Sequence, residues 1–74
     1  MRKYLEVKCI GGKTLINLEE IEAITCDDEY TEITLFFKSS RHLLIYDEDN
    51  SKFINRTYKK IRNELKKLEV QDNE

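Results

Sequence analysis

Polar and apolar side chains alternate at the start of the chain. Leu5, Val7 and Cys9 occupy every second position, and polar residues separate them. A period of two is typical of a strand with one face in a core and the other in water. The pattern therefore predicts a first strand over residues 4–9.

Gly11 and Gly12 end this alternation. Glycine adopts positive φ without a steric penalty, so a glycine pair can occupy both central positions of a tight hairpin turn. We therefore expect the first strand to pair with a second strand over residues 14–18.

The next segment mixes helical and extended features. Leu18, Ile21 and Ile24 recur every third residue, whereas the flanking residues have an extended pattern. This mixture predicts one helical turn at 19–21 and a third strand at about 23–26.

The strongest strand signal covers residues 31–37, which are rich in β-branched and aromatic side chains. Ile33, Leu35 and Phe37 share one face of this strand. After a polar turn, the nearly continuous apolar run at 42–46 predicts a returning strand with both faces partly covered.

A helix is predicted from Lys52 onward. The preceding residues 47–51 are polar, and such side chains accept hydrogen bonds from the free amides of a first helical turn. Apolar residues then recur at spacings of three and four, at Ile54, Tyr58, Ile61, Leu65 and Leu68. This stripe predicts a helix that packs on the sheet.

These elements predict an α+β fold, a small antiparallel β-meander of about five short strands packed against one carboxyl-terminal amphipathic helix. A chain of 74 residues has room for one domain. We assign residues 1–70 to that domain, and we expect the polar residues 71–74 to form a frayed tail.

Part of the meander resembles known families. Residues 16–24, with the sequence INLEEIEAI, and residues 30–35, with the sequence YTEITL, are similar to the first half of LytTR-type bacterial DNA-binding domains. The same stretch, preceded by Gly12 and Lys13, is similar to small FlbD-type proteins found with flagellar genes. The second half of the LytTR type is missing, and residues 38–41 replace the glycine turn of the FlbD type. The resemblance implies the β-meander, and no binding residue is carried over from either family.

Charge is divided unevenly along the chain. Residues 1–51 include six basic and eleven acidic residues, whereas residues 52–70 include seven basic and two acidic residues. The net charge of -2 therefore conceals an acidic meander and a basic helix. A sign asymmetry of this kind is informative about partners.

The basic residues of the helix suggest a contact with nucleic acid. Most lie off the apolar stripe, where they can neutralise phosphates in a salt-sensitive, sequence-independent contact. The candidate residues are Lys59, Lys60, Arg62, Lys66 and Lys67, with Tyr58 nearby. The alternative is a solvated helix face whose cations offset neighbouring carboxylates.

Two acidic runs suggest a different contact, with a basic protein. Complementary charge steers encounter and selects partners, so a negative surface can serve as a docking site. The candidate residues are Asp27, Asp28, Glu29, Asp47, Glu48 and Asp49. The alternative is turn chemistry together with solubility.

No set of residues in the sequence indicates catalysis. Catalysis needs a nucleophile and a base, paired carboxylates or a metal, and the only histidine is His42. Cys9, Cys26 and His42 lack the spacing of a zinc site, and we interpret the cysteines as buried thiols in a reducing compartment. We therefore expect no enzyme activity, no cofactor and no metal site.

The leading hypothesis is a noncatalytic, cytoplasmic regulatory or accessory protein that acts through protein–protein interaction. The start of the chain lacks the apolar run of a signal peptide, and no run reaches membrane-spanning length, so we expect no membrane contact. If Tyr4, Ile10, Phe36 or Leu44 faces outward, a second copy can cover it, and a homodimer is preferred to a monomer. The alternative function is a nucleic-acid-binding accessory protein that uses the basic helix.

Overall fold

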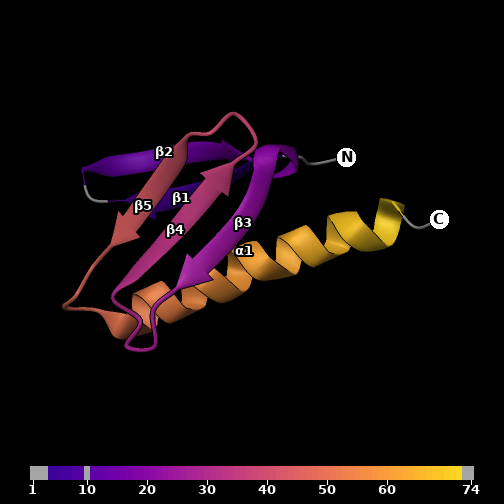
Figure 1. Ribbon diagram of the computed structural model, residues 1–74. Coiled ribbons are helices and arrows are strands. Elements are labelled where there is room, and N and C mark those ends of the chain that lie inside the picture. Colours follow the sequence, from indigo (N-terminus) through magenta and orange to yellow (C-terminus); the bar gives the residue numbers. More distant parts are fainter. Residues whose placement is uncertain (1–3, 10, 73–74) are drawn as a thin grey trace.

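The computed structural model describes residues 4–9 and 11–72. Its elements follow the chain in the order β1 (Tyr4–Cys9), β2 (Gly12–Asn17), η1 (Leu18–Glu20), β3 (Ile21–Cys26), β4 (Glu32–Phe37), β5 (His42–Tyr46) and α1 (Ser51–Asp72). Consecutive strands within each sheet are antiparallel, and α1 lies along one side of the strands (Figure 1). The predicted α+β meander packed against one carboxyl-terminal helix is confirmed.

The meander is divided into two sheets, which the sequence pattern does not indicate. β1 pairs with β2, while β3, β4 and β5 form a second sheet in that order. The division occurs at η1, where Asn17 Oδ1 accepts a hydrogen bond from the Glu19 amide at 3.1 Å. The Ile21 amide donates to the Leu18 carbonyl at the end of the same turn. This turn redirects the chain, so β3 pairs with β4 alone.

The β1–β2 hairpin differs by one position from the predicted turn. The register pairs Cys9 with Gly12, so Gly12 begins β2 instead of lying inside the turn. Gly11 and Gly12 both have positive φ, at 88° and 150°, which confirms the conformational reason for a glycine pair. Residue 10 lies outside the described residues.

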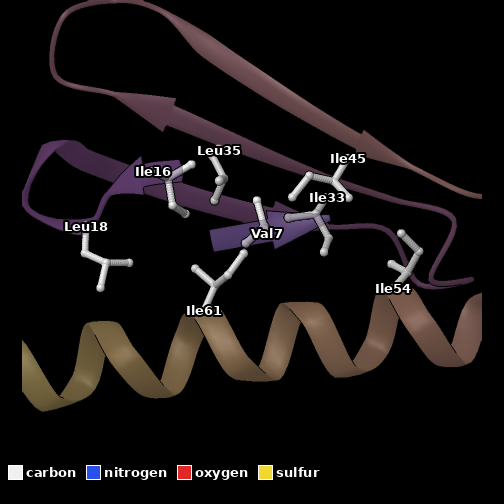
Figure 2. Close-up of a cluster of buried hydrophobic side chains, with 8 residues drawn as sticks. All are labelled: Val7, Ile16, Leu18, Ile33, Leu35, Ile45, Ile54 and Ile61. Carbon is white, nitrogen blue, oxygen red and sulfur yellow. The ribbon is translucent and has the colours of Figure 1, made fainter. Parts of the chain in front are cut away.

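One core of buried apolar side chains lies between α1 and the strands (Figure 2). Its members are Val7, Ile16, Leu18, Ile33, Leu35, Ile45, Ile54 and Ile61. Full burial of such a side chain is worth about 1.5–3 kcal/mol. The predicted inward face of β4 is confirmed, because Phe37 also packs against this core.

α1 begins with a side-chain cap from the predicted polar loop. The Phe53 amide donates to Asn50 Oδ1 at 3.0 Å, and the Ile54 amide donates to the Asn50 carbonyl at 3.2 Å. Ile54 and Ile61 are fully buried, and the other three residues of the predicted stripe pack against the core. The amphipathic stripe is therefore confirmed.

The end of α1 lies within the segment assigned to the polar tail. α1 ends at Asp72, so it includes the first two residues of that segment. Residues 73 and 74 lie outside the described residues. Fraying of this end therefore stays a prediction.

The outer face of the three-stranded sheet is less covered than its inner face. Leu44 of β5 is 50% exposed there, whereas Ile45 is 1% exposed on the inner face. The prediction that both faces of β5 are partly covered agrees with the half exposure of Leu44, and α1 packs on the inner face of this sheet (Figure 1).

Candidate functional site

The first candidate surface is the outer face of the sheet formed by β3, β4 and β5. Side chains alternate between the two faces of a strand, so the burial of Ile33 and Leu35 directs Thr34 and Phe36 outward. The cross-strand register adds neighbours from β3 and β5. The resulting outer sheet face comprises Ala23, Thr25, Glu32, Thr34, Phe36, His42, Leu44 and Tyr46.

Two large apolar side chains dominate the outer sheet face. Phe36 is 41% exposed and Leu44 is 50% exposed. Phe36 pairs with His42 and Thr34 pairs with Leu44, so Phe36 and Leu44 are diagonal neighbours on adjacent strands. The Phe36 and His42 rings lie 6.5 Å apart between centroids. Glu32 pairs with Tyr46 at one end of the face, whereas Thr34, Phe36 and Leu44 at its centre carry no charge.

Of the other side chains that a second copy was predicted to cover, Tyr4 does not lie on the outer sheet face. Tyr4 is 50% exposed, but it lies on β1 and therefore belongs to the other sheet. Leu15, which the sequence pattern does not single out, is 64% exposed on β2. Ile10 lies outside the described residues. Of the predicted contacts, Phe36 and Leu44 are the pair that the structure brings together.

The two acidic runs meet at one end of the molecule. The Asp47 amide donates to the Thr31 carbonyl at 2.9 Å. This bond joins the β3–β4 loop to the loop that leads into α1, and both loops lie near the start of the helix (Figure 1). The tertiary structure thus gathers the predicted acidic residues into one region.

Asp27 uses its carboxylate inside its own loop. Oδ1 accepts hydrogen bonds from the amides of Thr31 at 2.7 Å and Glu32 at 2.9 Å, and Oδ2 accepts one from the Thr31 hydroxyl at 2.6 Å. The bond from the Thr31 hydroxyl, followed by that from the Glu32 amide, holds the pKa of Asp27 below its ordinary value. The cause is that these donors favour the charged carboxylate.

Asp47 and Glu48 also have local partners. Asp47 Oδ1 accepts a hydrogen bond from the Asp49 amide at 3.2 Å. A side-chain hydrogen bond with Glu48 raises the pKa of the Tyr46 phenol, because the carboxylate favours the protonated hydroxyl. Turn chemistry therefore explains part of the acidic runs. Docking on a basic protein stays a prediction, for which the exposed candidates are Asp28, Glu29, Glu48 and Asp49.

The second candidate surface is the outer side of α1. The five basic residues singled out in the sequence are all exposed, as are Lys52 and Arg56. Together they form the basic ridge, which comprises Lys52, Arg56, Lys59, Lys60, Arg62, Lys66 and Lys67. Arg62 Cζ lies 5.6 Å from the centroid of the Tyr58 ring. Because Tyr58 packs against the core, it supports Arg62 and does not project as a contact of its own.

Lys60 connects the basic ridge to the β1–β2 hairpin. It lines a hollow of about 230 Å³ between α1 and the hairpin, together with Lys8, Lys13 and Thr57. Lys13 Nζ lies 3.8 Å from Glu6 Oε2 in the same hollow. The positive surface therefore continues from the helix onto the hairpin.

The cysteines and the histidine lie apart from any metal-binding cluster. Cys9 and Cys26 are free and only partly buried, and both pack against the core, so the prediction of buried thiols holds in part. Burial, together with the neighbouring Asp27 and Asp28, raises the pKa of the Cys26 thiol. His42 lies exposed at the start of β5. Among the side chains that the structure describes, no group of three His, Cys, Asp or Glu residues is placed to hold a metal ion.

No protein-family model, curated protein or solved structure matches this chain. The similarity to LytTR-type and FlbD-type proteins therefore stays an expectation from the sequence. Among the residues that the structure describes, no helix is both long enough and apolar enough to cross a membrane.

Proposed function

We propose that this protein is a noncatalytic, cytoplasmic regulatory or accessory protein that acts through protein–protein contacts at its outer sheet face. The observation that carries this proposal is the exposure of Phe36 and Leu44 as diagonal neighbours on the side of the sheet that α1 leaves open. Contiguous apolar groups of this kind gain free energy when a partner removes them from water.

The occupant that we propose is a second copy of the chain. The acidic loops and the basic ridge each carry mainly one sign of charge, so either surface repels its own copy. On the outer sheet face, the carboxylate of Glu32 lies at one end beside Tyr46, so two copies can stack over Phe36 and Leu44 with little like-charge repulsion. In a two-fold arrangement, Phe36 of one copy meets Leu44 of the other, and the same contact occurs twice.

Light scattering of purified protein over a range of concentrations tests this proposal. We expect a dimer for the wild-type chain and a monomer for Leu44→Asp, because the new carboxylate must lose its water in the contact. Leu15→Asp is the matched control, since Leu15 is also exposed but lies on the other sheet. It should remain a dimer.

Two results contradict the proposal. One is a wild-type chain that stays monomeric at about 1 mM. A dissociation constant of about 1 mM corresponds to only about 4 kcal/mol of association free energy. The other is equal loss of the dimer in Leu44→Asp and Leu15→Asp. Circular dichroism melts of both variants establish that a change of mass is not caused by unfolding.

A further inference from the structure

We propose that the basic ridge of α1 binds the phosphate backbone of duplex DNA without sequence preference. This binding is additional to the proposed contact between two copies and does not depend on it. The ridge and the outer sheet face lie on opposite sides of the β3–β4–β5 sheet, because α1 packs on its inner face (Figure 1).

Basic residues outnumber acidic residues on the helix that carries the ridge. α1 carries seven basic residues and three acidic residues, Glu64, Glu69 and Asp72, of which the last two lie at its carboxyl-terminal end. Lys67 Nζ lies 3.1 Å from Glu64 Oε2, and this is the only ion pair on α1 among the side chains that the structure describes. A solvated face that balances its own charge needs more carboxylates than this. The charge pattern instead complements a polyanion.

The spacing of the ridge suits an extended backbone. Lys52, Lys59 and Lys66 are seven residues apart, so they share one line along the helix at intervals of about 10 Å. The other four basic residues lie on either side of this line. An array that runs along several turns of a helix can meet several phosphates at once, since duplex DNA carries one charge for about every 1.7 Å of its axis.

The acidic loops leave most of the ridge accessible to an anion. They lie near the start of α1 (Figure 1), whereas Lys67 is about 24 Å further along the helix at a rise of 1.5 Å per residue. The Debye length at physiological ionic strength is about 8 Å. Repulsion by the loops therefore acts mainly near Lys52 and is screened over the rest of the ridge.

The surroundings of the ridge favour a duplex over a single strand or a membrane. Phe53 and Tyr58 pack against the core, so neither is available as a platform on which an unpaired base stacks. Ile54 and Ile61 are fully buried in the same core, so α1 cannot insert its apolar face into lipid while it stays docked. What remains is a contact made by charge alone.

Fluorescence anisotropy with a mixed-sequence DNA duplex of about 20 base pairs, measured at several salt concentrations, tests the proposal. If about four phosphates are contacted, the slope of log K against log salt is about -3.6. Lys59→Gln combined with Lys66→Gln removes two contacts, so the slope should become shallower by about 1.8. The matched control is Lys38→Gln combined with Arg41→Gln, which removes the same charge from the exposed β4–β5 turn and should keep the wild-type slope.

The same assay identifies the outcomes that contradict the proposal. These are absence of duplex binding at low salt, equal weakening by the ridge variant and the control, and tighter binding to a single strand or to anionic lipid vesicles than to the duplex. The measurements are repeated with Leu44→Asp, so that failure of the dimer proposal and failure of DNA binding are distinguishable.

Discussion

At the residue scale, Asp27 is the clearest case of an acidic side chain with a structural role. Its carboxylate accepts hydrogen bonds from the Thr31 amide and hydroxyl and from the Glu32 amide. These bonds hold the loop that precedes β4, in which Tyr30 has a φ of 57°. The sequence gives turn chemistry as one interpretation of the acidic run, and the structure assigns that chemistry to this residue.

The lowered pKa of Asp27 predicts a specific acid sensitivity. Because the folded state depresses this pKa, the stability that Asp27 contributes is complete above its unfolded pKa of about 4 and is lost as pH falls through the folded value. As pH falls from about 6 to about 2, we expect the free energy of unfolding to decrease less for Asp27→Asn than for the wild-type chain. Urea unfolding across this range measures the effect. Asp28→Asn, which lies outside the network, should retain the wild-type acid dependence.

The cap of α1 gives a second prediction at this scale. Asn50→Ala removes the side-chain acceptor of the Phe53 amide, and we expect the free energy of unfolding to fall by about 1 kcal/mol. Asn50→Asp keeps an acceptor and should stay close to the wild-type value. Equal destabilisation of both variants in urea unfolding contradicts a capping role for this side chain.

At the scale of elements, the packing of α1 determines whether the sheets hold together. Ile61 is fully buried between α1 and the strands (Figure 2). Ile61→Ala removes buried methyl groups and leaves a cavity, so we expect a loss of about 2–5 kcal/mol, a large share of the stability of so small a domain. Lys66→Ala, on the exposed side of the same helix, should change stability by less than about 0.5 kcal/mol. Urea unfolding followed by circular dichroism compares the two variants.

At the scale of the whole molecule, the outer sheet face and the basic ridge point in opposite directions. We therefore expect their functions to be separable. Leu44→Asp should abolish the dimer and leave DNA binding by each chain unchanged. The double ridge variant Lys59→Gln with Lys66→Gln should weaken DNA binding and leave the dimer intact. Because the two sites share no partner residues, the effects should add when the substitutions are combined. Light scattering and anisotropy on all three variants measure this, and strong non-additivity contradicts separate faces.

Local pattern predicted most of the elements, since the period of a strand or a helix depends on residues that are close in the sequence. The alternation at Leu5, Val7 and Cys9 located β1, and the stripe through Ile54 and Ile61 located α1. The same stripe placed the basic residues on the exposed side of α1, so the basic ridge follows from the sequence. The shift of the glycine turn by one position was not predictable, because register depends on which residue pairs across the hairpin.

The sequence by itself therefore determined the order and type of the elements, the inward side of α1 and the sign of charge along the chain. The tertiary structure decided the division into two sheets, the meeting of the acidic loops through the Asp47 amide and Thr31 carbonyl, and the exposure of Leu44. The physical reason is the range of the interactions. A pattern indicates which side chains are apolar, but whether a face is covered depends on contacts between segments that are distant in the sequence, and one helix covers only one face of a sheet.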